Sequence, residues 1–136
     1  MMPVDLRNEQ RTVPLDLRRL RRQAESLMEE VRRGGSTLSV LLTDDRRMTR
    51  LHLRWMGEEG PTDVMSFPMD EAGVLGDIVI SAETAARRRP NHPAAEILRY
   101  LVHGLLHLTG HDHRAAAQRL RMNRRARQLQ AKVKAA

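Results

Sequence analysis

The stretch HGLLHLTGHDH, residues 103–113, carries the strongest structural and chemical signal in this sequence. His103 and His107 are one helical turn apart, so both imidazoles leave the same face of a helix. Gly110 suits the left-handed backbone at a helix C-terminus, and the turn there brings His113 back toward the first two rings. Three neutral imidazoles on one Zn²⁺ leave a fourth position for water, which is typical of a catalytic site. The pattern therefore predicts a zinc site formed by these three histidines.

The same histidine spacing occurs in the metalloprotease signature H-E-x-x-H-x-x-G-x-x-H. In those proteases the glutamate is the general base that activates water. Here that position holds Gly104, which cannot accept a proton. A glycine inside a helix also costs about 1 kcal/mol relative to alanine, and close approach by a substrate or another backbone is one reason to tolerate it. The sequence thus predicts a metal cage of the protease type without the protease base.

Three further histidines have less specific surroundings. We interpret His111, inside the motif, as a loop or substrate-facing residue, and we do not expect it to bind the metal. His52 and His92 lie far from the motif in the sequence, so we interpret them as ordinary surface residues. The predicted metal site therefore involves only half of the six histidines in the chain.

Carboxylates are the candidates for moving a proton or orienting a ligand. Asp112 lies between His111 and His113, so it either orients a ligand imidazole or acts as a base, and we prefer the orienting role. Asp63 and Asp77 either line the same cleft or form the capping and turn hydrogen bonds that aspartate commonly makes. The only candidate catalytic residue is accordingly Asp112.

Size and composition favour one domain in the cytosol. A chain of 136 residues is long enough to bury its own core. It has no cysteine, which excludes disulfides and thiolate metal sites and suits a reducing compartment. The N-terminus lacks the apolar core of a signal peptide, and the most apolar stretch, residues 97–108, is too short and polar to span a bilayer. We expect a soluble, cytoplasmic protein that does not interact with membranes.

The net charge of +7 is concentrated at the C-terminus. After Asp112 there is no acidic residue, whereas this tail holds eight of the 24 lysines and arginines. Such a block beside a metal motif favours a polyanion, most naturally RNA, and the alternative is a solvated helix face that keeps the protein soluble. The chain has one tryptophan, one phenylalanine and one tyrosine, so RNA would be bound mainly through phosphates and shape.

The pattern of apolar residues predicts the fold class. It indicates strands over residues 3–8, 37–43, 63–67 and 76–81, and helices over residues 14–33, 45–56, 82–89, 94–109 and 114–132. We expect the first helix to end at Gly34 and Gly35, and DEAG at 70–73 to join two strands in a hairpin. The interleaved order predicts a single α/β (α+β) domain with a mixed sheet of about four strands packed with about five helices. The motif helix would pack against this sheet through its apolar side, namely Leu101, Val102, Leu105 and Leu106.

Together with two other stretches, the motif makes this chain similar to the YbeY family of bacterial rRNA-maturation endoribonucleases. The resemblance rests on HGLLHLTGHDH, on PTDVMSFP at residues 61–68 and on LGDIVIS at residues 75–81, in the family's order. It implies one zinc ion on the motif's three histidines and a mixed four-stranded sheet. It also implies cleavage of single-stranded RNA in rRNA 3′-end maturation and ribosome quality control. The implied partners are rRNA and ribosomal or small-subunit components, with no DNA specificity.

Two features depart from the family pattern. Many relatives carry an arginine just after the aromatic residue that precedes PTDV, where this chain has Met56 after Trp55. That arginine is thought to bind phosphate, so its role has no assigned residue here. Arg54 would point to a different side of the helix and does not replace it. Many relatives also have a glutamate-rich C-terminal helix, whereas this one is basic, so its function does not follow from the resemblance.

The preferred function is hydrolysis of RNA phosphodiesters at a zinc ion, which lowers the pKa of its water to about 7. Whether water or the RNA 2′-hydroxyl attacks stays open. One alternative is a metallopeptidase-like hydrolase, which the histidine spacing supports and the missing glutamate opposes. The other is a non-enzymatic, ribosome-associated factor with a structural metal, which would explain the basic tail.

Overall fold

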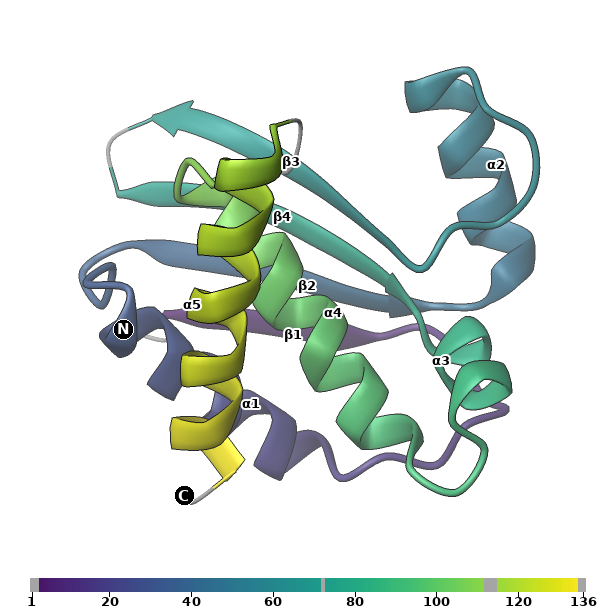
Figure 1. The fold of residues 1–136 in the computed structure, drawn as a ribbon. Helices are drawn as coiled ribbons and strands as arrows, with labels where there is room; N and C mark the ends of the chain where they lie inside the picture. The colour runs from purple at the N-terminus through teal and green to yellow at the C-terminus, as the bar shows by residue number, and fades with distance from the viewer. Residues whose placement is uncertain (1–2, 72, 112–114, 135–136) are drawn as a thin grey trace.

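A mixed sheet forms the centre of the molecule (Figure 1). The computed structural model describes residues 3–71, 73–111 and 115–134. Within these ranges the sheet has four strands in the order β1-β2-β4-β3: β1 (Val4–Asn8), β2 (Thr37–Thr43), β4 (Val74–Ser81) and β3 (Val64–Glu71). Strands β1, β2 and β4 run parallel, whereas β3 pairs antiparallel with β4. The predicted mixed sheet and its hairpin are therefore confirmed.

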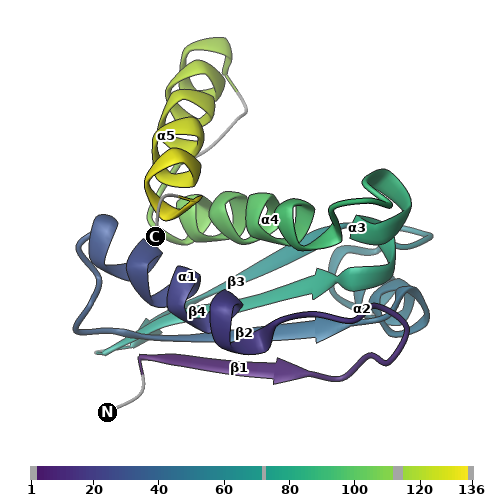
Figure 2. The ribbon, with the colours of Figure 1, turned by 90° about the horizontal axis from the view of Figure 1, so that it is seen from below.

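Helices cover both faces of this sheet. Within the described ranges there are five: α1 (Leu17–Glu30), α2 (Asp45–Met56), α3 (Ala82–Arg88), α4 (Pro93–Leu108) and α5 (Ala116–Lys134). Helices α1 and α4 lie on one face, and α5 lies outside α4, as the two views of the ribbon show (Figures 1 and 2). The α/β class predicted from the sequence is confirmed.

Alternate residues of β4 belong to two different cores. Ile78 and Ile80 pack in the large core with apolar residues of α1, α3, α4 and α5. Val79, between them, packs in a small core with Met48 of α2 and Met65 of β3. Because successive side chains of a strand point to opposite faces, α2 covers the face of the sheet that α4 does not.

Helix α4 lies on the sheet as the apolar pattern predicted. Four of its apolar side chains are at most 1% exposed: Leu101, Val102, Leu105 and Leu106. A Cβ atom on Gly104 would lie 3.0 Å from Cγ2 of Ile78 and 3.0 Å from Oγ of Ser66. The groups that approach Gly104 so closely are therefore side chains of the sheet, which explains the glycine without a contact to a substrate or another backbone.

Helix α1 is shorter than the predicted span of 14–33 at both ends. It begins at Leu17, because the carboxylate of Asp16 caps it by accepting a backbone N–H of the first turn at 3.1 Å. It ends at Glu30, and Arg32 adopts the left-handed backbone, with φ 61°. The glycine pair at 34–35 follows this turn and does not form it, contrary to the prediction.

Helix α5 docks onto the molecule through one narrow stripe. Its buried side chains recur at helical spacing: Met122, Ala126, Leu129 and Val133. They join the large core, where α5 contacts α4 and α1. Neither α5 nor any other helix in the described part of the chain combines the length and apolarity that crossing a bilayer requires.

Candidate active site

A cavity of about 690 Å³ opens between α4, α5 and strand β3. Strand β3 and the loop before it contribute Asp63 and Ser66, α4 contributes Arg99, and α5 contributes Asn123. Met56, at the end of α2, closes one side. The cavity therefore combines two parts of the sequence, the end of α2 with strand β3 and the consecutive helices α4 and α5.

His103 and His107 line this cavity from consecutive turns of α4. His103 is half-buried, whereas His107 is exposed. Residues on the opposite side of the same helix, including Val102 and Leu105, are fully buried, so packing decides which face of α4 meets the cavity. Two of the three predicted metal ligands thus share one wall, as the four-residue spacing predicts.

The predicted third ligand, His113, and the candidate base Asp112 lie outside the described residues. Helix α4 does end where expected, because Gly110 adopts a φ of 98° and the N–H of His111 donates to the carbonyl of Leu106 at 2.9 Å. Within the described ranges, no three His, Asp or Glu side chains are arranged to hold a metal ion. The three-histidine site therefore stays a prediction.

The donors that are described suit zinc. Zn²⁺ takes imidazole nitrogens, and two imidazoles on one helix face are a common part of its sites. His103 and His107 provide this pair on a helix whose opposite side is fixed in the core. Their wall faces a cavity, which gives a substrate access to the same place. The residues present therefore fit a zinc ion that is completed by at least one further ligand.

Asp63 lines the cavity, but its carboxylate already has partners. Its Oδ2 accepts a hydrogen bond from Arg88 at 2.8 Å, and its Oδ1 accepts the N–H of Val64 at 2.8 Å. Arg88 also donates to the hydroxyl of Tyr100 at 3.3 Å, and burial raises the pKa of Tyr100. Both roles considered for Asp63 are therefore present together, since it borders the cavity and also caps the start of β3.

Arg99 brings a positive charge that is partly neutralised. Its guanidinium makes two hydrogen bonds to the carboxylate of Glu96, at 2.7 and 3.1 Å. Glu96 is 3% exposed, and the hydrogen bonds from Arg99 lower the pKa of its carboxyl group. The guanidinium carbon also lies 5.4 Å from the centre of the Tyr100 ring. Arg99 is thus a fixed cation whose charge is shared with a buried acid.

Helix α5 contributes a second cation to the cavity. Arg119 and Asn123 are one turn apart and line it together with Met122, which is 2% exposed. Arg119 itself is exposed. Among the described residues, its guanidinium has no hydrogen-bond or ion-pair partner. The basic helix therefore reaches the predicted active site with an uncompensated charge.

Asp77 does not line this cavity, so one of the two roles considered for it is wrong. It lies opposite Phe67 in the β3–β4 ladder and faces a groove of about 520 Å³ beside α2. The reason is the pleat of β4, which sends Asp77 and Val79 to the α2 face and Ile78 to the α4 face.

The remaining histidines lie away from the cavity. His111 is a loop residue, as expected, but it lines a separate hollow near Arg125. His52 is not an ordinary surface residue, because its ring is half-buried and lies 2.9 Å from the carbonyl of Gly60 and 3.1 Å from Glu58. His92 is exposed at the start of α4, as expected.

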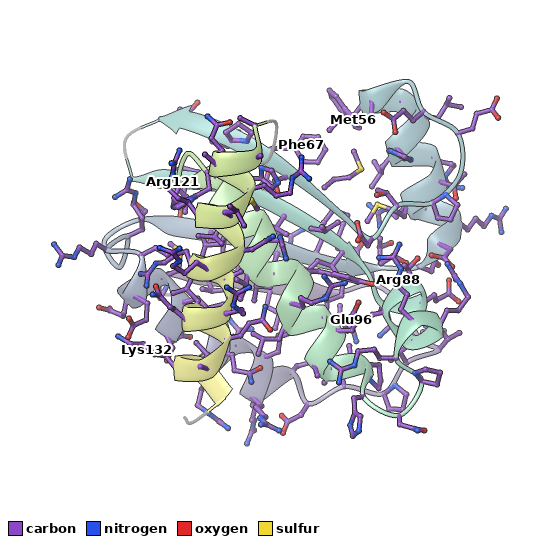
Figure 3. All side chains as sticks on the ribbon, in the orientation of Figure 1. Met56, Phe67, Arg88, Glu96, Arg121 and Lys132 are labelled. Atoms are coloured by element: carbon purple, nitrogen blue, oxygen red, sulfur yellow. The ribbon has the colours of Figure 1, made fainter. Side chains whose placement is uncertain are left out.

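Met56 occupies the position where the family pattern has an arginine. It lines the cavity and is 50% exposed (Figure 3). Arg54 instead lies over the ring of Trp55, at 5.5 Å, and is not among the lining residues. Trp55 in turn meets Phe67 edge to face, with the ring centres 6.0 Å apart. The expectation that Arg54 points elsewhere is confirmed.

Several lining residues were not identified from the sequence. Arg99 precedes His103 by four residues, so the helical spacing that linked the histidines also placed Arg99 on their face. That signal was present and was missed. For Arg119 and Asn123 the sequence gives no comparable indication, because no local pattern predicts where α5 crosses α4. Ser66 lies in the stretch PTDVMSFP, but the sequence alone does not indicate that it lines a cavity.

Comparison with known proteins identifies relatives of this chain. A family model described as Endoribonuclease YbeY matches residues 5–134. Among curated proteins, an Endoribonuclease YbeY from Thermobifida fusca is 44% identical and the match covers 82% of this chain and 81% of that protein. One from Geobacter sulfurreducens is 37% identical, with 94% and 93% covered. One from an Anaeromyxobacter species is 45% identical, and the match covers 82% of this chain but only 62% of that longer protein.

A solved structure agrees with the fold. A protein from Thermotoga maritima, determined in solution, is 25% identical and superposes with a TM-score of 0.62. The match covers 97% of this chain and 92% of that one. The arrangement of sheet and helices described above is therefore found in an experimentally determined structure.

Proposed function

This chain belongs to the YbeY family of endoribonucleases, and we propose that it cuts single-stranded RNA with the help of one zinc ion. We further propose that its substrate is the 3′ end of small-subunit rRNA, and that it acts in ribosome quality control in the cytoplasm. The observation that supports this most is the cavity that His103 and His107 line together with Arg99 and Arg119. Nitrogen donors beside two arginines are suited to a metal and a phosphodiester together.

The cavity contains two kinds of residue, histidines that would bind a metal ion and an arginine that would bind RNA. His103 and His107, with the predicted ligand His113, would hold the zinc ion. When bound, the ion supplies a Lewis acid for a phosphoryl oxygen and lowers the pKa of water to about 7. Arg99, on the same helix as the histidines, binds a phosphate of the strand, because a guanidinium matches the geometry of a phosphate oxygen pair.

The size of the cavity supports a preference for single strands. A space of about 690 Å³ is in the range that holds a small-molecule-sized piece of substrate. A flexible strand brings one phosphodiester into such a space, whereas an A-form duplex keeps its backbone in a fixed helical arrangement. The scarcity of aromatic side chains predicts little base preference, since stacking needs such rings.

The packing of α4 disfavours the metallopeptidase alternative. In that class the residue after the first histidine is the glutamate base. The same position here, Gly104, lies directly against Ile78 and Ser66 of the sheet. A longer side chain has no room there, so this helix is built without the protease base.

The test compares three substrates for the zinc-loaded protein. We expect cleavage of an end-labelled single-stranded RNA, much slower cleavage of the same RNA annealed to its complement, and no cleavage of an unstructured peptide. His107→Ala should lower RNA cleavage at least about a hundredfold, because it removes a metal ligand. His92→Ala is the matched control, since His92 is exposed and lies outside the cavity.

Each alternative has its own signature in this experiment. A cut peptide with intact RNA would establish a metallopeptidase. Intact RNA and peptide, with ribosome binding retained in both histidine variants, would establish a non-enzymatic factor. Mapping of rRNA 3′ ends in cells that carry His107→Ala or His92→Ala tests the cellular role. We expect unprocessed ends only with His107→Ala, and normal ends there would refute the role in rRNA maturation.

A further inference from the structure

The basic residues of α5 are not equivalent. Two of them contact α1, because Arg125 donates to the carbonyl of Glu30 at 3.0 Å and Lys132 pairs with the carboxylate of Glu30 at 3.0 Å. Arg119, at the other end of the helix, lines the cavity with the histidines. Basic residues in the C-terminal half of α5 therefore help to hold this helix against α1, whereas Arg119 near its N-terminus lines the cavity.

Packing determines which side of α5 faces the cavity. Arg119, Met122 and Asn123 are spaced by three and four residues, so they share one face of the helix. Met122 is 2% exposed and belongs to the large core, which holds that face against α4. Arg121 is two residues after Arg119, and its side chain points to the opposite side of α5 from Met56 and Phe67 (Figure 3). Only one orientation of α5 buries Met122, and that orientation brings Arg119 to the cavity.

The two arginines of the cavity differ in how their charge is used. Arg99 is bound to Glu96 through two hydrogen bonds, so part of its donor capacity is taken. Arg119 has no such partner among the described residues. A guanidinium carries five N–H donors in a planar fork, which match two oxygens of a phosphate. Among the residues that the structure describes, no group occupies the guanidinium of Arg119, so its donors are available to a ligand.

We propose that Arg119 binds an RNA phosphate across the cavity from His103 and His107, and so aligns the strand on the histidine wall. The inference rests on the proposed function and adds to it the residue through which the basic helix acts. Asn123, one turn further on the same face, provides an amide donor for the same strand. This contact from α5 adds to the one proposed for Arg99 of α4, whereas Met56 at the end of α2 has no charge to offer.

A single phosphate contact has a measurable signature. Removing one such contact from a single-stranded complex lowers the slope of log affinity against log salt by about 0.7. We expect Arg119→Gln to weaken binding of a labelled single-stranded RNA roughly tenfold at low salt, with that smaller slope. In cleavage assays KM should rise by a similar factor, while kcat changes much less. Arg119→Lys should lie between the two, since lysine keeps the charge but loses the planar fork.

Arg121→Gln is the matched control. It removes the same charge from the same helix, but from an exposed side chain that does not line the cavity and points to the other side of α5 from Met56 (Figure 3). We expect its affinity to stay within about twofold of the wild type, because one remote charge adds little at moderate salt. Equal losses in Arg119→Gln and Arg121→Gln would overturn the inference, since the helix would then act only through its overall charge.

The same measurements separate this inference from the proposed function. A wild-type protein that binds RNA but does not cut it would contradict the proposed nuclease activity, while the binding data still decide the role of Arg119. A protein that neither binds nor cuts single-stranded RNA would overturn both. Urea unfolding of each variant excludes misfolding, and Arg119 is exposed, so we expect unchanged midpoints.

Discussion

Helices α4 and α5 line one cavity from two sides, yet they are held in place very differently. Nine of the 16 residues of α4 are buried, including most of its centre. Helix α5 is buried along one stripe, and its other described side chains are mostly exposed and often basic. Helix α4 is thus embedded in the core, whereas α5 joins it through one stripe only.

This difference agrees with the roles proposed for the two helices, a metal site on α4 and a phosphate contact on α5. A metal site needs its ligands fixed within fractions of an ångström, which only a tightly packed element provides. A phosphate contact tolerates more freedom, because the attraction between charges falls off gradually with distance. We therefore expect substitutions in α4 to act mainly on folding and metal geometry, and substitutions in α5 to act mainly on RNA binding.

The largest effect should come from Gly104→Glu, which creates the protease-like sequence in α4. The new side chain would meet Ile78 and Ser66 and bury a carboxylate without a partner, so we expect a loss of more than about 3 kcal/mol in the free energy of unfolding. Leu120→Glu in α5 is the contrast, because Leu120 is 66% exposed, and we expect a change within about 0.5 kcal/mol. Urea denaturation measures both. Equal stability of the two variants would mean that α4 is no more tightly packed than α5.

Leu129→Ala should weaken the packing of α5 on the core without changing the positions of His103 and His107 on α4. Leu129 is fully buried, so the substitution should cost about 2–4 kcal/mol in unfolding free energy. We also expect a higher KM for RNA, since the helix that carries Arg119 is less firmly held. Leu53→Ala removes the same atoms from a side chain that is 56% exposed, and it should change neither quantity. An unchanged KM in Leu129→Ala would show that α5 needs no firm docking to serve the cavity.

A smaller, pH-dependent effect should come from Glu96→Gln in α4. Hydrogen bonds from Arg99 hold the pKa of Glu96 below its usual value. A depressed pKa stabilises the fold above the ordinary titration range of a glutamate, and this contribution disappears as the pH falls through the folded-state pKa. We expect the variant to be about 1–2 kcal/mol less stable than the wild type near neutral pH, with the gap closing in acid. Urea unfolding across that pH range measures it, and a gap that widens in acid would contradict the pairing.

The smallest effect should come from Lys132→Ala at the far end of α5. Its ion pair with Glu30 is well exposed, with 61% and 33% of the two side chains accessible. We expect a loss below about 0.5 kcal/mol, which salt further reduces. A double-mutant cycle with Glu30→Ala isolates the pair from the hydrogen bond that the Glu30 carbonyl accepts from Arg125. A coupling above about 1 kcal/mol would show that exposed charges contribute more to docking than the buried stripe suggests.

Local signals explain which parts of the fold were predictable. Strand 37–43 and helix 45–56 have the predicted bounds, because apolar periodicity and a capping aspartate mark them within a few residues. The end of α1 was misplaced, since a non-glycine residue, Arg32, adopted the left-handed turn at an energetic cost that the sequence does not reveal. Asp77 was assigned two roles because alternation along a strand does not say which helix covers which face.

The sequence by itself determined that His103 and His107 share a helix face, that α4 has an apolar side and that Gly110 ends it. Each of these depends only on the geometry of a few consecutive residues. The tertiary structure alone decided that Gly104 contacts the sheet, that Asp77 faces away from the histidines and that Arg119 joins them. These facts depend on how whole helices pack across a sheet, which is set by many weak contacts between distant residues and by no local pattern.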